Sequence, residues 1–334
     1  MDIRKRRIGK TDLEVTELGF GGTAIGGLYR ACPRDQAMAT LEAAWQAGIR
    51  LFDNAPLYGY GLSERVVGDY LRDKPRNEYV LITKVGRPLR PLRAGESHNE
   101  IFVGGLPFDI EHDYSYDGVM RSLEQSYARL GLNRIDVLLA HDLGVETHGA
   151  EAAVHHMRQF LDGGVKALEE LKRAGDISAY GLGVNEIPVC LELMCHAPID
   201  CILLAGRHTL LDRSAEDELI PLCRDSGTSL IIGGVFNSGI LATGPSPDAH
   251  FNYAPASPDI VDKVVEMQGI ADACGFPLAA AALQFPLRSD VVASVLLSTA
   301  RPESLKRNLS LMDLPIVAGD FARFEECRVS SLQP

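Results

Sequence analysis

The stretch Leu51-Phe-Asp-Asn-Ala-Pro-Leu-Tyr-Gly59 decides the prediction of the fold. It begins as a short apolar run that ends on a carboxylate, and turn-forming residues follow. A helix-like pattern comes next, over residues 63–71. A short apolar run, a turn and a helix in this order are typical of a β/α unit whose strand is buried on both faces.

Similar units recur along the whole chain. We predict strands at residues 15–19, 51–53, 80–83, 135–140, 177–182, 201–204, 229–232 and 291–296. Helical periodicity is clearest at residues 37–47, 63–71, 116–130, 164–174 and 260–273. Alternation of strands and helices predicts a parallel sheet, and eight strands close a (β/α)8 or TIM barrel. We therefore predict an α/β fold with one barrel domain over residues 1–334.

A doubly wound open sheet is the alternative to the barrel. Such a sheet normally carries Gly-x-Gly-x-x-Gly after its first strand. The corresponding stretch here, Gly19-Phe-Gly-Gly-Thr-Ala-Ile-Gly-Gly27, does not follow that spacing, which favours the barrel. Residues 87–113, 142–156 and 242–258 read as long loops, and in a barrel we expect long loops of this kind on the catalytic face.

Composition and charge exclude several classes of protein. The net charge of −12 repels phosphate backbones, so we expect no nucleic-acid partner. Neither a secretory signal nor an apolar window of about 18 residues is present, which predicts a cytoplasmic protein without a membrane partner. The seven cysteines lack a Cys-x-x-Cys pair and the nine histidines lack His-Glu-x-x-His, so we expect no metal site. Nothing in the sequence predicts an oligomeric state.

Three chemically active side chains end neighbouring predicted strands. They are Asp53, Lys84 and His141, and Tyr58 follows Asp53 in the next loop. Taken singly, each has an ordinary structural interpretation, such as a turn, a solvated cation or ring packing. Taken together, they predict an active site, because a parallel barrel brings the ends of its strands to one mouth.

These residue types suit hydride transfer between an alcohol and a carbonyl compound. The alcohol must lose a proton as hydride leaves its carbon, and a tyrosine can take that proton. The ordinary tyrosine pKa of about 10 is high for this task, and we expect a nearby lysine ammonium to lower it. A carboxylate orients the lysine, and an imidazole holds the reacting oxygen.

At this point the chain resembles the aldo-keto reductase superfamily. The resemblance covers nearly the whole chain and includes Gly19-Phe-Gly-Gly22, Phe52-Asp-Asn-Ala-Pro-Leu-Tyr-Gly59, Gly61-Leu-Ser-Glu64 and Leu81-Ile-Thr-Lys84. It implies that Asp53, Tyr58, Lys84 and His141 form the family's catalytic tetrad, with Tyr58 as the acid/base. It also implies a nicotinamide cofactor that lies across the barrel mouth without a Rossmann fingerprint.

Further stretches are similar to the sugar dehydrogenase branch of that superfamily, which contains D-threo-aldose (L-fucose) and L-galactose dehydrogenases, and to a related pyridoxal 4-dehydrogenase. The stretches include residues 113–122, Gly183-Val-Asn-Glu186, Leu204-Ala-Gly-Arg207, residues 236–244 and Asn252-Tyr-Ala-Pro255. The resemblance implies a small-molecule substrate, an aldose oxidised at C1 to a lactone, with pyridoxal as the alternative. A cofactor-binding regulatory subunit without activity is the alternative from another class.

A departure from the family pattern bears on the choice of cofactor. Many NADP-preferring relatives carry a Lys, a Ser and an Arg that clamp the 2′-phosphate, and the matching positions here are Ser298, Thr299 and Ser304. Two charge-assisted contacts are therefore missing, which favours NAD. NADP remains the alternative, because Arg301 is a nearby cation.

The resemblance implies further cofactor contacts. Asn308 matches an asparagine that contacts adenine, with a helix-surface residue as its ordinary interpretation. The usual Ser-Asn pair that holds the carboxamide appears as Asn185-Glu186, and Asn185 can still supply a donor and an acceptor. The backbone of a loop is expected to cradle the pyrophosphate, and its residues are Phe236, Asn237, Ser238 and Gly239.

Overall fold

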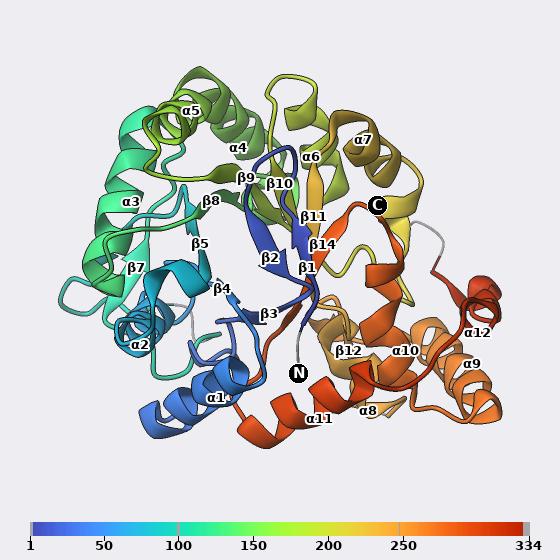
Figure 1. The fold of residues 1–334 in the computed structure, drawn as a ribbon. Helices are drawn as coiled ribbons and strands as arrows, with labels where there is room; N and C mark the ends of the chain where they lie inside the picture. The colour runs from blue at the N-terminus through green and yellow to red at the C-terminus, as the bar shows by residue number, and fades with distance from the viewer. Residues whose placement is uncertain (1–2, 99–100, 247, 330–334) are drawn as a thin grey trace.

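Eight parallel strands form a closed barrel in the computed structural model, which describes residues 3–98, 101–246 and 248–329 (Figure 1). Each barrel strand pairs with its neighbours in chain order, and the last pairs with the first. The predicted (β/α)8 barrel is confirmed. The strands are β3 (Leu18–Gly21), β4 (Leu51–Asp53), β5 (Val80–Val85), β8 (Val137–His141), β9 (Ala179–Val184), β10 (Cys201–Ala205), β11 (Ser229–Gly233) and β14 (Val292–Leu297).

Helices surround the barrel and cover the outer faces of its strands (Figure 1). They are α1 (Arg34–Gln46), α2 (Leu62–Leu71), α3 (Tyr116–Leu130), α4 (Val145–Gln159), α5 (Val165–Ala174), α6 (Ile187–Met194), α7 (Leu219–Ser226), α8 (Ile240–Thr243), α9 (Pro258–Cys274), α10 (Leu278–Gln284), α11 (Pro302–Met312) and α12 (Ala318–Ala322). A π-helical segment, Phe160–Gly164, joins α4 to α5. Short 3-10 segments lie at Arg76–Glu78, Ser214–Glu216, Asn237–Gly239, Phe285–Arg288 and Glu325–Cys327.

Alternation along each strand separates the barrel interior from the layer between barrel and helices. Leu51, Ile82 and Leu139 belong to an interior cluster, whereas Phe52 belongs to the larger cluster beneath the helices. Because side chains alternate along a strand, the residue two places after an interior residue also points inward. This period of two determines where the last residue of each strand points.

An N-terminal hairpin closes the amino end of the barrel. It pairs β1 (Lys5–Arg7) with β2 (Glu14–Thr16) in antiparallel fashion, and buries Ile8 and Val15 against the interior cluster. The predicted strand over residues 15–19 is therefore wrong in its bounds. The run is divided at Glu17, whose carboxylate accepts a hydrogen bond from Arg6 and whose carbonyl accepts one from Val295, so β2 belongs to the hairpin and β3 to the barrel.

The three predicted loops contain regular structure. Residues 87–113 include the hairpin of β6 (Leu89–Pro91) with β7 (Phe108–Ile110). Residues 242–258 include the hairpin of β12 (His250–Phe251) with β13 (Ala254–Pro255), and position 247 lies outside the described residues. The prediction of a loop over 142–156 is wrong, because α4 begins at Val145.

No single helix among the described residues is long and apolar enough to cross a membrane. Helix α9 and the segment Leu278–Arg288 meet the length and composition criteria only as a pair, bent by 98°.

Candidate active site

The ends of three adjacent strands aim three polar side chains into the barrel mouth. Asp53, Lys84 and His141 each stand two residues after an interior apolar residue, so the strand period turns them inward. They occupy the carboxyl ends of β4, β5 and β8, which pair directly. All three are buried, at 2%, 1% and 5% exposure. The barrel interior therefore ends in a polar layer.

Lys84 is the centre of this layer. Its Nζ lies 2.8 Å from Asp53 Oδ1, 2.8 Å from the Asn54 carbonyl oxygen and 3.1 Å from the phenolic oxygen of Tyr58. Gly183 on β9 leaves room for it, because a Cβ there would lie 3.0 Å from the Lys84 side chain. The ammonium is thus held against a carboxylate and a phenol at once.

The turn after β4 delivers Tyr58 to the lysine. Ser63 Oγ lies 2.8 Å from the Gly22 carbonyl oxygen and 2.6 Å from Asn54 Oδ1, which ties the first residues of α2 to the turn. Beside it, the fully buried Glu64 accepts hydrogen bonds from Thr83 at 2.6 Å and from Arg129 at 2.5 Å. A buried carboxylate with two donors is satisfied, so these contacts hold the turn and the start of α2 in place.

Burial and a neighbouring charge have opposite effects on the pKa of Lys84, and likewise on the pKa of Tyr58. Burial lowers the pKa of Lys84, but the neighbouring Asp53 carboxylate and Tyr58 raise it by more. The net shift is upward, so the lysine stays charged. Burial raises the pKa of Tyr58, and Lys84 opposes that rise. The expected lowering by lysine is therefore present as a contribution, while the net shift of the phenol is upward because burial outweighs it.

His141 faces Tyr58 across the mouth. The two rings are nearly perpendicular, with centroids 5.9 Å apart. Burial, together with the charges of Arg87 and Lys84, places the pKa of His141 well below its ordinary value. A neutral imidazole carries one N–H donor and one acceptor nitrogen, so His141 can donate a hydrogen bond to an oxygen near Tyr58.

The expected cofactor residues lie after β9, β11 and β14, at the same end of the barrel. Asn185 directly follows β9 and is half-buried. Ser298 Oγ accepts the Ala24 N–H at 3.2 Å, and Thr299 Oγ1 accepts the Arg301 N–H at 3.2 Å. Arg301 is exposed at the start of α11, and on that helix lie the half-buried Ser304 and the buried Asn308.

The loop over residues 236–239 has an unusual backbone. Asn237, Ser238 and Gly239 have consecutive positive φ values of 43°, 58° and 103°. Successive residues of this kind can turn backbone N–H groups toward an anion, which fits a pyrophosphate. The Asn237 side chain is committed within the protein, to Thr209 at 2.6 Å and to the Gly206 carbonyl at 3.3 Å.

Two of the four backbone donors in this loop also have internal partners. The N–H of Asn237 donates to the Gly234 carbonyl, and the N–H of Gly239 donates to the Phe236 carbonyl. In this conformation, a cradle for the pyrophosphate would have to be made by the remaining backbone N–H groups, those of Phe236 and Ser238.

Glu186 has a structural role that could not be predicted from its match to the carboxamide-binding pair of the family. Its carboxylate accepts hydrogen bonds from the backbone N–H groups of Val145 and Glu146, the first residues of α4. A Cβ at Gly144 would lie 2.3 Å from that carboxylate, so a side chain there would displace the carboxylate from its present position. Glu186 therefore caps α4, and only Asn185 of the expected pair remains for the cofactor.

Three further residues beside the site were also missed. Arg87 and Asp142 form an ion pair at 3.0 Å next to His141. Tyr114 is fully buried and donates a hydrogen bond to the His141 carbonyl at 2.6 Å. The positions of Arg87, three residues after Lys84, and Asp142, directly after His141, were the available signals.

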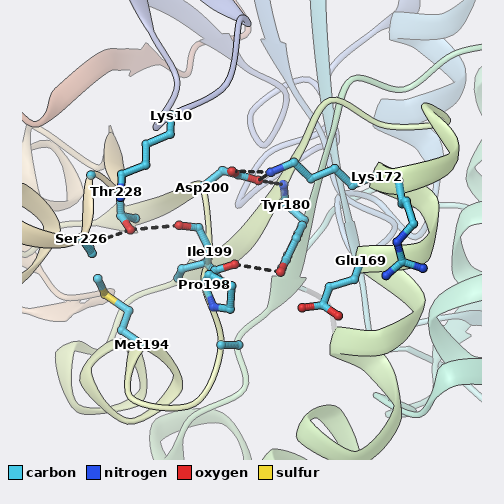
Figure 2. A pocket seen from close by; sticks show the side chains of 13 residues that line it. Lys10, Glu169, Lys172, Tyr180, Met194, Pro198, Ile199, Asp200, Ser226 and Thr228 are labelled. Atoms are coloured by element: carbon cyan, nitrogen blue, oxygen red, sulfur yellow. Dashed lines mark hydrogen bonds and ion pairs between the residues drawn. The ribbon is translucent and has the colours of Figure 1, made fainter.

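A cavity of about 660 Å³ lies at the opposite end of the barrel, beside the amino ends of β9, β10 and β11. Figure 2 shows the side chains that line it. Its polar groups bind each other: Lys172 pairs with Asp200 at 2.6 Å, and Tyr180 donates to the Pro198 carbonyl at 2.8 Å. The described residues that line this cavity include none of Asp53, Tyr58, Lys84 and His141. In the part of the chain that the structure describes, no group of three or more His, Cys, Asp or Glu side chains is arranged to hold a metal ion.

Known proteins resemble this chain over almost its full length. A model described as the aldo/keto reductase family matches residues 17–329. Pyridoxal 4-dehydrogenase from Microbacterium luteolum is 45% identical over 314 residues, covering 91% of this chain and 92% of its own length. D-threo-aldose 1-dehydrogenase from a Pseudomonas species is 38% identical over 325 residues, covering 95% of each chain. Among solved structures, the holo form of an aldo-keto reductase from Bacillus halodurans superposes with a TM-score of 0.77 at 25% identity, covering 97% of this chain and 96% of its own.

Proposed function

The chain belongs to the aldo-keto reductase family and is an oxidoreductase, and from this premise we propose that it oxidises a cyclic hemiacetal to a lactone with NAD. The leading substrate is an aldose of the L-fucose, D-threo-aldose or L-galactose type, oxidised at C1. Enzymes of this family use NAD(P)(H), and the nicotinamide ring supplies the acceptor for the hydride. We further propose that Asp53, Tyr58, Lys84 and His141 carry the proton chemistry.

The arrangement around Lys84 carries this proposal. As hydride leaves C1, the hemiacetal hydroxyl loses its proton to the phenolate form of Tyr58, whose oxygen lies 3.1 Å from Lys84 Nζ. The ammonium stabilises the phenolate form, and Asp53, 2.8 Å away, holds the ammonium in position. His141, neutral because of its depressed pKa, donates a hydrogen bond to the same substrate oxygen.

Residues at the mouth suit a dinucleotide that lies across it. The loop with three successive positive φ values follows β11, and residues 298–301, before α11, follow β14, so both lie at the same end of the barrel as Asp53, Lys84 and His141. Gly239 faces open space, since no heavy atom lies within 4 Å of a Cβ built there. We assign the pyrophosphate to the backbone of residues 236–239 and the adenosine half to Asn308, Ser298, Thr299 and Ser304.

Preference for NAD rests on missing cations. Ser298 and Ser304 stand where a phosphate clamp would need a lysine and an arginine, and Glu303 adds a negative charge close by. Arg301 is a cation three residues from both Ser298 and Ser304, and its exposed position at the start of α11 makes it the residue to test.

Pyridoxal is the second candidate, favoured by the 45% identity to a pyridoxal 4-dehydrogenase. Its cyclic hemiacetal offers the same reacting group as a cyclic aldose. The mouth also contains a polar network suited to a hydroxylated substrate, in which Arg207 donates to Asn252 at 2.9 Å after β10.

Appearance of NADH tests the function. Purified protein is offered L-fucose, L-galactose, D-arabinose, pyridoxal and simple aldehydes, each with NAD and with NADP. We expect the highest kcat/KM for an aldose with NAD; a higher value for pyridoxal would transfer the proposal to the second candidate. Tight NAD binding without turnover of any compound would overturn the proposal in favour of a regulatory subunit.

A further inference from the structure

Arg87 and Asp142 form a second ion pair at the mouth, separate from Asp53 and Lys84. Arg87 lies two residues beyond β5, and Asp142 follows the last residue of β8. Arg87 Nη2 lies 3.0 Å from Asp142 Oδ2. The arginine side chain is 5% exposed and the aspartate side chain is 20% exposed, so the carboxylate is the more accessible partner of the pair.

The backbone holds Asp142 in a conformation that non-glycine residues rarely adopt. Its φ is 44°, and its N–H donates to the Gly183 carbonyl at 2.9 Å. The hydroxyl of Tyr114 lies 3.2 Å from the Asp142 carbonyl and 2.6 Å from the His141 carbonyl. Such strain persists only when the surroundings fix it, and it is concentrated at functional sites.

The Arg87 guanidinium favours the charged form of the Asp142 carboxylate. Burial raises the pKa of Asp142, and the Arg87 guanidinium opposes that rise. Asp142 is the only carboxylate within ion-pair distance of Arg87 among the described residues. A buried arginine with a single acidic partner is costly for stability, which argues that the pair is retained for another reason.

One carboxylate oxygen is left for a ligand. Asp142 Oδ2 binds Arg87 and lies 3.5 Å from His141 Nε2, whereas no described residue donates a hydrogen bond to Oδ1. His141 is the group that we assign to the reacting oxygen. A carboxylate oxygen beside that imidazole lies within reach of a substituent on the carbon next to the reacting one.

We propose that Asp142 determines specificity by accepting a hydrogen bond from the substrate hydroxyl that neighbours the reacting carbon. That hydroxyl is the C2 hydroxyl of an aldose; the ring hydroxyl of pyridoxal lies one carbon farther from its reacting carbon. The inference rests on the proposed function and deepens it, because it names the feature that a substrate must carry. Simple alcohols and aldehydes lack the hydroxyl and leave a desolvated carboxylate without its partner.

A four-way comparison tests the proposal. Wild type and Asp142→Ala are assayed for kcat/KM with NAD, on L-fucose and on 2-deoxy-L-fucose. In the wild type, we expect loss of the hydroxyl to reduce kcat/KM by about 10- to 100-fold, the range for a hydrogen bond to a charged group. In Asp142→Ala this penalty should nearly vanish. An equal penalty in both proteins would overturn the proposal.

Two variants control for indirect effects. Asp290→Ala removes the aspartate of another Asp–Arg pair, with Arg224 at 2.7 Å, near the amino end of β14, and it should keep the full penalty. Asp142→Asn keeps the size of the side chain and one acceptor oxygen, so it should perturb the fold less than Asp142→Ala does. The loss of kcat/KM on removing the hydroxyl should be smaller in Asp142→Asn than in the wild type and larger than in Asp142→Ala, because neutral hydrogen bonds are weaker than charge-assisted ones. A full penalty in Asp142→Asn with a normal fold would contradict the need for charge.

A second pair of substrates separates failure of this inference from failure of the proposed function. Reduction of glyceraldehyde and of propanal with NADH does not require oxidation of an aldose. Glyceraldehyde carries hydroxyls that propanal lacks, and one of them is on the carbon next to the carbonyl carbon. If L-fucose is not oxidised but Asp142→Ala still removes the preference for glyceraldehyde, the aldose assignment fails and the Asp142 inference stands. If the preference is unchanged, the Asp142 inference fails.

Discussion

Lys84 Nζ lies 2.8 Å from Asp53 Oδ1, and neither side chain is exposed by more than 2%. Removing one partner of such a pair leaves a buried charge without compensation, whereas removing both leaves none. The two residues should therefore behave as a unit in stability measurements, whatever their contribution to turnover.

Replacing Asp53 alone should destabilise the protein. We expect Asp53→Ala to reduce the free energy of unfolding by about 3–5 kcal/mol, and the double variant Asp53→Ala/Lys84→Met to recover part of that loss. Urea denaturation followed by circular dichroism measures both. The two residues would act independently if the double variant were less stable than Asp53→Ala by the same free energy of unfolding that Lys84→Met costs in the wild type.

The rate of oxidation should rise with pH, because Tyr58 accepts a proton as a base. Burial raises the pKa of Tyr58 and Lys84 opposes that rise, so only a small fraction is phenolate near neutral pH. In Lys84→Met the opposing charge is lost, and the rise of kcat should move to higher pH. Lys84→Arg, which keeps the charge, should move it less. Profiles of kcat against pH measure the shift, and superimposable profiles would contradict the coupling.

Stability should fall on mild acidification. Burial is the main reason why the pKa values of His148 and His208 are lowered to about 4. The unfolded chain takes up these protons below about pH 6.5, while the folded chain does so only near pH 4. The free energy of unfolding should therefore decrease as the pH falls from 6.5 to 4.

Single histidine variants identify the source of that acid sensitivity. We expect His148→Gln to flatten the dependence of unfolding free energy on pH, measured in urea at pH 7, 6 and 5. Replacement of the exposed His250 by Gln is the matched control and should leave the slope unchanged. Equal slopes in all three proteins would show that His148 is not a source.

Installing the absent cations should change the choice of cofactor. Ser298→Lys/Ser304→Arg supplies both charges of a phosphate clamp, and we expect kcat/KM with NADP to rise by about 10- to 100-fold relative to NAD. Arg301→Ala is the companion variant in the wild-type background. A selective loss with NADP would show that Arg301 already contacts the 2′-phosphate, and a wild-type preference for NADP would refute the argument for NAD.

Local signals explain which helices could be predicted. Helix α3 begins and ends where the sequence placed it, because Ser115 accepts the Gly118 N–H and Gly131 ends the helix at a φ of 63°. The start of α4 was missed because its cap comes from Glu186, far along the chain. Helix α10 has most of its residues buried and therefore lacks an amphipathic period.

The same distinction applies to the site. Asp53, Lys84 and His141 could be found from sequence because each lies at or next to the last residue of a strand, and parallel strands end at one mouth. The Arg87–Asp142 pair joins residues after two strands in a way that no sequence period encodes. The division of the predicted strand at Glu17 also depends on tertiary contacts, to Arg6 and Val295.

Replacement of Tyr58 by Phe tests the proposed proton transfer most directly. The variant keeps the ring and loses only the hydroxyl that lies 3.1 Å from Lys84 Nζ. We expect kcat for oxidation to fall by at least about 100-fold, the lower range for general acid–base catalysis, while the Kd for NAD measured by calorimetry stays within about twofold. Turnover close to wild type in Tyr58→Phe, with intact NAD binding, would contradict the account.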